Sequence, residues 1–123
     1  MNRNPVGWFE IYVQDMERAR RFYESVFQVR LEKLPTSEIQ MWSFPSLPEQ
    51  PGAVGALVRV EGFPSGGNSV LVYFSCEDCA VIEGRVTTNG GRIQRPKMTI
   101  GEHGFVSLII DTEGNMLGLH SLK

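Results

Sequence analysis

Apolar and polar positions alternate near the start of the chain and then take up a helical spacing. In WFEIYV, residues 8–13, the odd positions are all apolar, whereas the even positions combine two aromatic rings with one carboxylate. This pattern predicts a strand with different environments on its two faces. Asp15 is then a good helix N-cap, and apolar residues recur every three or four positions as far as Phe27. We expect this helix to cover the odd face of the strand and to leave the even face to line something else.

The same order of elements is predicted again in the second half of the chain. Residues 69–75 alternate like the first strand, Asp78 repeats the N-cap, and NGG at 89–91 is a good helix end. DTEGN, residues 111–115, predicts a tight turn between the last two strands. The remaining strands are predicted around residues 29–34, 41–44, 54–60, 92–94, 104–110 and 116–122.

Aligning the two N-caps gives an internal repeat with an offset of 63 residues. The two halves match in the order of their elements and in strand phase, that is, in which strand positions face the same side, more than in residue identity. We therefore predict an α+β fold in which residues 1–123 form a single domain made of two βαβββ modules, 1–62 and 63–123. A module of this size should not be very stable alone.

The composition fits one globular domain without a polyanionic partner. Hydrophobic residues make up 41% of the 123 residues and charged residues 21%, which favours a packed core over disorder. A net charge of −2 gives no reason to expect nucleic acid as a partner. The start of the chain does not resemble a signal peptide, and no stretch approaches the roughly 20 apolar residues of a membrane span. We expect a cytoplasmic protein without a membrane partner.

Cys76 and Cys79, in CEDC, are the two cysteines of the chain. They fall where a strand should end and a helix begin, a position that lowers thiol pKa values and would suit a redox pair. The intervening Glu77 and Asp78 oppose thiolate formation, and no second pair is spaced to complete a zinc site. A structural role is therefore favoured.

Two segments, VGWFEIYVQDMERARRFYESVF and GFVSLIIDTEGNMLGLHS, together with the repeated element order, resemble the vicinal oxygen chelate superfamily, the glyoxalase/bleomycin resistance group. The resemblance implies paired βαβββ modules that form a curved mixed sheet around a cavity, usually in a homodimer. In the catalytic branches of that superfamily, one residue from each of four strands holds a divalent metal, which chelates neighbouring substrate oxygens.

Carried over by strand phase, the four metal-binding positions of the superfamily are Trp8, Gly55 or Ala56, Leu71 and Gly118 in this chain. None of these side chains offers the nitrogen or carboxylate oxygen that a divalent metal requires. The resemblance therefore implies a member with no metal site and no cofactor. Gly118 should leave open space in the cavity wall.

The predicted cavity face still carries aromatic and polar groups, a mixture typical of small-molecule pockets. The predicted ligand-binding residues are Trp8, Glu10, Tyr12, Trp42, Tyr73 and His120, although the pattern does not fix which face Trp42 occupies. Glu10 and His120 are also candidates for a catalytic base and acid. An atypical metal site made of Glu10, His103 and His120 stays open as an alternative.

Our leading hypothesis is a metal-free, dimeric protein that binds a small organic molecule in an aromatic-lined cavity. The first alternative is an enzyme, a lyase or isomerase resembling lactoylglutathione lyase, which would use Glu10 and His120 or a metal. The second alternative is an antibiotic-binding resistance protein. It differs from the leading hypothesis only in the ligand.

Overall fold

The computed structural model describes residues 4–123, which form two α-helices and two sheets. The order strand, helix and three strands occurs twice, as the sequence pattern predicts. The elements are β1 (Trp8–Tyr12), α1 (Met16–Phe27), β2 (Glu32–Lys33), β3 (Gln40–Ser43), β4 (Val54–Arg59), β5 (Tyr73–Ser75), α2 (Cys79–Thr88), β6 (Arg92–Thr99), the 3₁₀ helix η1 (Gly101–His103), β7 (Phe105–Ile110) and β8 (Met116–Ser121).

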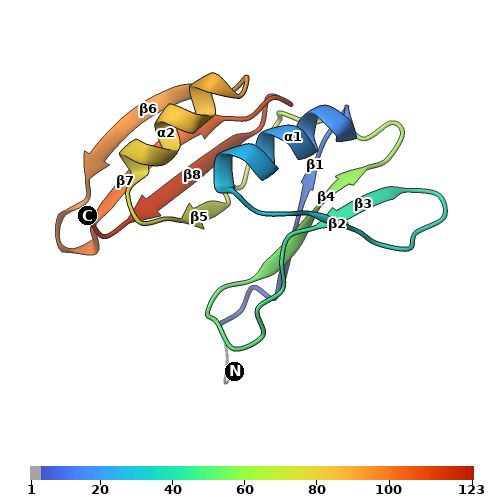
Figure 1. Cartoon of the computed structure of the whole chain (residues 1–123), viewed down its shortest axis with the longest axis horizontal. Helices are drawn as coiled ribbons and strands as arrows, with labels where there is room; N and C mark the ends of the chain where they lie inside the picture. Colours follow the sequence, from blue (N-terminus) through green and yellow to red (C-terminus); the bar gives the residue numbers. More distant parts are fainter. Residues whose placement is uncertain (1–3) are drawn as a thin grey trace.

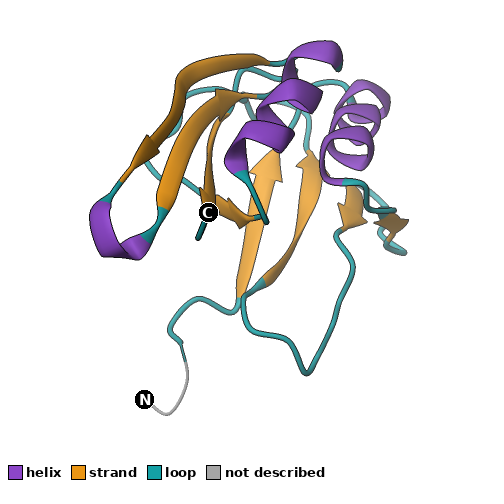
Figure 2. Cartoon of the chain, turned by 60° about the vertical axis from the view of Figure 1, so that its left-hand side comes forward, coloured by secondary structure: helices purple, strands orange, loops and turns teal. Residues whose placement is uncertain are grey.

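Each half of the chain forms its own four-stranded sheet. The strand orders are β1-β4-β3-β2 and β5-β8-β7-β6, with one parallel pair in each sheet, β1 with β4 and β5 with β8. Both helices lie on the same side of the sheets, next to each other (Figures 1 and 2). This arrangement is the predicted α+β fold of paired βαβββ modules, with the mixed sheet divided into two.

Both helices begin at the predicted N-caps. The Asp15 carboxylate accepts a hydrogen bond from the backbone N–H of Arg18 at 3.0 Å, and the Asp78 carboxylate accepts one from the backbone N–H of Ala80 at 2.9 Å. These bonds satisfy backbone donors that the first turn of a helix would otherwise leave without a partner.

Strand lengths differ from the predicted ones where other groups take over the backbone hydrogen bonds. The strand predicted over residues 69–75 shortens to β5 because the Asn68 side chain bonds the backbone N–H and carbonyl of Met116 in place of strand pairing. The strand predicted over 29–34 shortens to β2, and the Glu24 carboxylate accepts from the backbone N–H of Leu31 just before it. By contrast, β6 extends beyond the predicted residue 94 to Thr99. It can include Pro96, which has no N–H to donate, because register shifts interrupt the pairing with β7 at this point.

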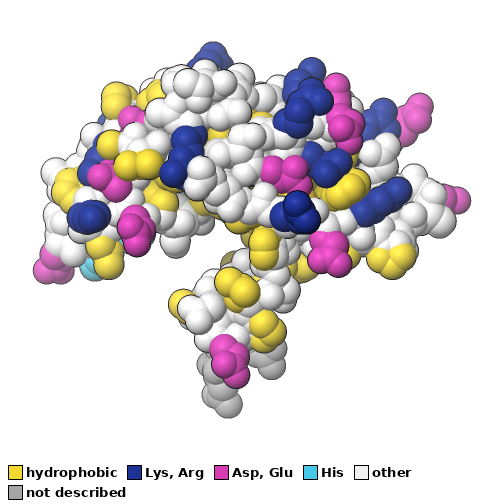
Figure 3. All heavy atoms as spheres, viewed as in Figure 1, with side chains coloured by type: hydrophobic (Ala, Val, Ile, Leu, Met, Phe, Trp, Pro, Cys, Tyr) yellow, Lys and Arg dark blue, Asp and Glu magenta, His cyan; other side chains and the backbone are white. Residues whose placement is uncertain are grey.

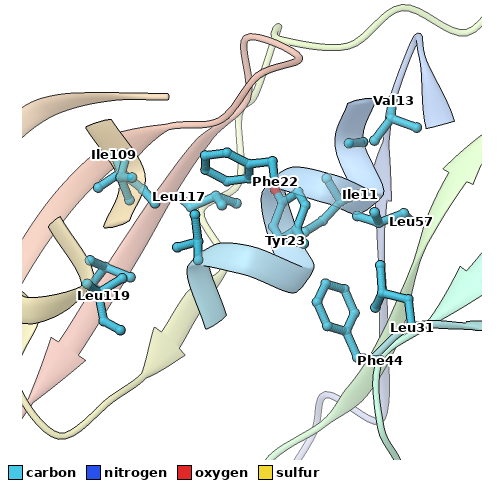
Figure 4. Close-up of a cluster of buried hydrophobic side chains, with 14 of the residues drawn as sticks. Ile11, Val13, Phe22, Tyr23, Leu31, Phe44, Leu57, Ile109, Leu117 and Leu119 are labelled. Carbon is cyan, nitrogen blue, oxygen red and sulfur yellow. The ribbon is translucent and has the colours of Figure 1, made fainter. Parts of the chain in front are cut away.

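The hydrophobic core lies between the helices and both sheets (Figure 4). Phe22 and Tyr23 of α1 are fully buried, between Leu117 of β8 on one side and Ile11 of β1 on the other (Figure 4). α1 therefore packs against residues from both modules.

The turn between β7 and β8 forms a second link between the modules. Three of its polar side chains, Asp111, Glu113 and Asn115, are buried, and each forms hydrogen bonds with the first half of the chain. Tyr23 donates to Asp111 at 2.6 Å, and the Asn115 amide donates to the Tyr12 carbonyl at 2.9 Å. The predicted tight turn is confirmed, but its side chains also hold the two halves together.

Candidate ligand-binding site

The side of the sheets that faces away from the helices carries most of the predicted site residues. On β1, Ile11 points into the core, so its neighbours Glu10 and Tyr12 stand on the opposite, open face with Trp8. The Trp8 side chain is 44% exposed there, and Tyr73 of β5 is 49% exposed. Large aromatic rings exposed to this extent on one face mark a surface suited to binding.

The Glu10 carboxylate is held by its two neighbours on the open face of β1. Trp8 Nε1 donates to Glu10 Oε2 at 3.1 Å, and the Tyr12 hydroxyl donates to Glu10 Oε1 at 3.0 Å. Each carboxylate oxygen keeps a lone pair for a further donor. The bond to Glu10, followed by burial and by the charge of the carboxylate, raises the pKa of Tyr12, so this hydroxyl stays a donor at neutral pH.

A small cavity of about 220 Å³ adjoins Glu10 and Tyr12. It lies between β1, the segment that connects the two modules and the start of β8. Its lining residues are Glu10, Ile11, Tyr12, residues 64–68, Val70, Val72, Asn115, Met116 and Leu117. Among them, Glu10 is the one formally charged side chain at neutral pH. Phe63 stacks on the Tyr12 ring at 5.5 Å between centroids and so fixes that ring beside the cavity.

Tyr73 occupies the space that Gly118 was expected to leave open. The two residues are partners on the parallel strands β5 and β8, and the Tyr73 ring lies against the α-carbon of Gly118, where a Cβ would collide with it. The expectation of open space at Gly118 is therefore wrong. The glycine leaves room for the aromatic ring that packs on this position.

His120 shares the open face of the second sheet but bonds away from Glu10. Its Nε2 donates to the His103 carbonyl at 2.7 Å, because a carbonyl oxygen can only accept. Within residues 4–123, Glu10 bonds only Trp8 and Tyr12, and no hydrogen bond joins it to His120. The two candidate acid–base residues, Glu10 and His120, therefore have different hydrogen-bond partners in the structure.

Trp42 lies on the opposite face of the first sheet from Glu10. It packs against the core, and the Arg20 guanidinium of α1 lies 3.6 Å from its ring centroid. Of the six residues predicted to bind ligand, the open faces therefore carry Trp8, Glu10 and Tyr12 on β1, Tyr73 on β5 and His120 on β8. Trp42 belongs to a different surface.

The residues at the four metal-binding positions do not fit a metal. Strand register pairs Ala56, rather than Gly55, with Glu10, so Ala56 is the residue on the open face of β4. Trp8, Ala56, Leu71 and Gly118 all lack a suitable donor atom. Across residues 4–123, no three His, Cys, Asp or Glu side chains are grouped so that they could hold a metal ion, and this covers the set Glu10, His103 and His120.

The two cysteines lie outside the open faces, at the start of α2. Cys79 is fully buried, and the Ser121 hydroxyl donates to its sulfur at 3.2 Å. Burial, together with the neighbouring Cys79, raises the pKa of Cys76 from its ordinary value to about 12. Since the thiolate is the reactive form, this environment favours the structural interpretation of the pair.

Sequence reasoning missed two contributors to the site. EGFPSGG, residues 61–67, has the composition of a connector, yet Phe63 stacks on Tyr12 and residues 64–68 line the cavity. Their Pro, Gly and Ser content is typical of any loop and gives no sign of such a contact. The second omission is Asn115, whose side chain donates to the Tyr12 carbonyl and accepts from the backbone N–H of Gly66, and so fixes the position of the cavity wall.

Comparison with known proteins agrees with this fold. The family model for the glyoxalase/bleomycin resistance protein/dioxygenase superfamily matches residues 6–119, so the chain belongs to that superfamily. A glyoxylase-like domain-containing protein of Didymella fabae is 28% identical over 118 residues, which cover 89% of this chain and 88% of the relative. A putative glyoxylase, CFP32, of Mycobacterium tuberculosis is 27% identical over 119 residues. The match covers 92% of this chain but spans only 44% of the mycobacterial protein.

Solved structures share the fold at low sequence identity. A V278E mutant of glyoxalase I from Zea mays superimposes with a TM-score of 0.75 at 21% identity, over 95% of this chain and 46% of the maize chain. TnmS3, an antibiotic-binding protein from Streptomyces sp. CB03234, has a TM-score of 0.70 at 26% identity, over 100% of this chain and 99% of its own. Neither helix of residues 4–123 has the length and hydropathy needed to cross a membrane.

Proposed function

We propose that the chain is a metal-free binding protein for a small organic molecule, which lies over Trp8 and Tyr12 and donates a hydrogen bond to Glu10. The observation that carries this proposal is the carboxylate held by two aromatic side chains beside a cavity. The rings supply apolar surface, and the remaining lone pairs of Glu10 supply orientation. The lack of donor atoms at all four metal-binding positions supports the metal-free form of the proposal.

The charge of the cavity defines which ligands it favours. Because Glu10 is the one formally charged group in the lining, an anionic ligand would be repelled and a ligand with N–H or ammonium donors would be attracted. A planar aromatic amine satisfies both the rings and the carboxylate. Proflavine, a planar aromatic cation, and anthraquinone-2-sulfonate, a planar aromatic anion, therefore form a suitable first pair of probes within a wider screen of aromatic amines.

The binding test uses the indole N–H signal of Trp8 in a nitrogen-correlated NMR spectrum. We expect proflavine or another aromatic amine to shift this signal and anthraquinone-2-sulfonate to leave it unchanged. Glu10→Gln should weaken the binding roughly tenfold, as expected for the loss of one charge-assisted hydrogen bond, whereas the matched change Glu38→Gln on an exposed loop should not. If no aromatic amine moves the Trp8 signal, or if E10Q binds as tightly as the wild type, the proposal fails.

The metal-free state is tested separately, by metal analysis and by titration with metal ions. Protein purified without a chelator should contain less than one equivalent of any transition metal, and calorimetric titration with zinc, nickel and manganese should show no tight site. One equivalent bound at micromolar affinity would contradict this part of the proposal.

We propose that a second copy of the chain covers the open faces and completes the cavity, as predicted for a homodimer. A cavity of about 220 Å³ is smaller than the ~300–1,000 Å³ typical of ligand pockets. Hydrophobic side chains also lie exposed on the arm that projects below the helical layer, formed by residues 4–7 and the loop between β3 and β4 (Figure 3). Sedimentation equilibrium should give twice the 13.8 kDa mass of one chain. A single-chain mass at all concentrations would refute the dimer.

A binding protein for an antibiotic is the second candidate function. The observation that favours it is the match to TnmS3, which covers almost the full length of both chains. It predicts that expression of this chain raises the inhibitory concentration of an aromatic amine antibiotic and that the E10Q variant does not. The acid–base alternative has weaker support, because Glu10 and His120 bond to separate neighbours.

A further inference from the structure

The helix-facing side of the first sheet carries a second depression, separate from the cavity at Glu10. It has a volume of about 640 Å³ and lies between the start of α1 and the strands β2, β3 and β4. Its lining residues are Gln14, Asp15, Met16, Glu17, Lys33, Gln40, Trp42 and Arg59. None of these residues lines the cavity at Glu10.

The floor of this depression is built by strand pairing. Lys33 of β2 is the antiparallel partner of Trp42 on β3, and Gln40 of β3 is the partner of Arg59 on β4. Partner residues stand on the same face of a sheet, so a lysine, an indole, an amide and a guanidinium form two adjacent rows. This arrangement places two cationic groups at the margins of an aromatic surface.

The indole and the guanidinium are both held in place. Arg20 of α1 covers one side of the Trp42 ring at 3.6 Å, and Glu17 holds Arg20 by an ion pair at 2.9 Å. Arg59 Nε donates to the Gln14 carbonyl at 3.0 Å, which leaves the two terminal nitrogens of its guanidinium available to another acceptor. A ligand would thus meet Trp42 and Arg59 already held in place.

The depression is lined by two carboxylates and two cations, and the two cations are the groups that can bind an anion. Of the two carboxylates, Glu17 forms an ion pair with Arg20, and Asp15 is directed to the first turn of α1, where it accepts from the backbone N–H of Arg18. Among residues 4–123, neither Lys33 nor Arg59 forms an ion pair. Two cationic groups that form no ion pair in a concave site can each bond a carboxylate through charge-assisted hydrogen bonds.

We propose that this depression is a binding site for a small carboxylate with an apolar body. The carboxylate bonds Lys33 and Arg59, and the apolar body lies against Trp42, with Gln40 as a further hydrogen-bonding group. The site takes ligands of the opposite charge from those favoured at Glu10, on the other face of the same sheet. Each site can therefore be present without the other.

The two tryptophans of the chain separate the two sites in one experiment, because Trp8 reports the open face and Trp42 the helix-facing side. Three probes differ only in their polar group: phenylacetate, 2-phenylethanol and phenethylamine. We expect phenylacetate to shift the Trp42 indole N–H signal with a dissociation constant of about a few millimolar, a reasonable affinity for so small a ligand. The Trp8 signal should not move, and the neutral and cationic probes should bind Trp42 at least roughly tenfold more weakly.

Charge-removing variants test the assignment. Lys33→Gln and Arg59→Gln should each weaken phenylacetate binding roughly tenfold, while Arg21→Gln, which removes an exposed arginine outside the depression, should leave it unchanged. Because Arg59 also bonds backbone, Lys33→Gln on the exposed edge strand keeps the test valid if R59Q proves unstable. Equal binding of 2-phenylethanol, unchanged affinity in K33Q, or no Trp42 shift at roughly 20 mM phenylacetate would each overturn the proposal.

Discussion

Glu10 shows how one residue sets the chemistry of its neighbours. The pKa of Tyr12 is raised first by its hydrogen bond to Glu10, then by burial and by the charge of the carboxylate. In Glu10→Gln the amide oxygen can still accept the bond, but the negative charge is gone, so the pKa of Tyr12 should fall toward its ordinary value near 10. The stability that this bond supplies is present below pH 10 and is lost as the pH rises through the raised pKa.

The measurement for this prediction is a pH titration of the ring carbon signals of Tyr12 by NMR. Glu38→Gln should leave the titration of Tyr12 unchanged, since Glu38 lies in a loop away from β1. A Tyr12 pKa that is the same in wild type and E10Q would show that the bond at 3.0 Å does not persist in solution.

Gly118 gives a second prediction at the residue scale. A Cβ at this position would collide with the Tyr73 ring, so Gly118→Ala should push the ring outward. The ring is 49% exposed and can move without moving the backbone, so we expect a loss of only about 1 kcal/mol in the free energy of unfolding. Urea denaturation measures it, and in a Tyr73→Ala background the cost of G118A should disappear. An unchanged cost in that background would mean that the ring is not the cause.

Gly84 provides the control for that substitution. It lies within α2, and a Cβ there would meet no heavy atom within 4 Å. Gly84→Ala should therefore raise the free energy of unfolding by roughly 0.5–1 kcal/mol, because alanine loses less backbone entropy in a helix.

Strand alternation correctly predicted which residues of β1 face the core, since a period of two follows directly from strand geometry. It could not place Trp42, because β3 lacks clear alternation and its face is set by pairing with Leu57 of β4. It also could not predict that Tyr73 fills the space at Gly118. That contact joins residues 45 positions apart, and only the parallel pairing of β5 and β8 brings them together.

At the scale of elements, the turn between β7 and β8 concentrates hydrogen bonds on one carboxylate. The Glu113 side chain is fully buried and accepts from the backbone of Gln14 and Asp15, from Thr112, and from Arg18 through two nitrogens. Burial raises the pKa of Glu113, but the hydrogen bonds, led by Arg18, outweigh it and lower the pKa from 4.5 to about 2. The start of α1 is thus fixed to a turn of the other module.

The free energy of unfolding should depend on the protonation of Glu113 at acid pH. Because the pKa of Glu113 is lower in the folded chain, the stability it supplies is fully present above pH ~4.5 and is lost as the pH falls toward 2. The loss amounts to about 3 kcal/mol. At pH 7, Glu113→Gln should cost about 2–3 kcal/mol, less than for a fully buried pair, because Arg18 is half exposed and remains solvated.

The comparison of wild type with E113Q separates the contribution of Glu113 to the pH dependence of stability from the contribution of its neighbour Asp111. Burial raises the pKa of Asp111 despite its bonds to Tyr23 and Asn115, so Asp111 favours folding at lower pH and partly offsets the effect of Glu113. Urea denaturation at pH 7, 5 and 3 should show the two proteins converging as the pH falls. A constant difference between them across this range would contradict the lowered pKa of Glu113.

The sequence predicted DTEGN as a turn because Asp, Gly and Asn carry local turn chemistry. The roles of Glu113 and Asn115 depend on residues about 50 to 100 positions away, which no local pattern encodes. Likewise, the pattern over residues 69–75 predicts a full strand, but Asn68 replaces part of its ladder with side-chain bonds.

At the scale of the whole molecule, the internal repeat predicted the two modules but not how they pack. The α1 residues Tyr23 and Phe27 belong to the first module, yet Tyr23 bonds Asp111 and Phe27 stacks on Phe74 at 4.4 Å between centroids. Arg85 of α2 donates to the Val26 carbonyl at 3.5 Å in the same region. The modules therefore share one core, and neither buries its helix alone.

This shared core predicts that the fragments 1–62 and 63–123 do not fold separately. Alone, the first fragment would lose the partner of the Tyr23 hydroxyl and much of the apolar surface that covers α1, and a chain of about 60 residues has little stability to spare. Each fragment should give a poorly dispersed amide NMR spectrum and no cooperative thermal transition. An equimolar mixture should recover the dispersed spectrum of the intact chain, because the contacts between modules need no covalent link. A folded spectrum from either fragment alone would show that the modules are independent domains and that the bonds at Asp111 and Glu113 only orient them.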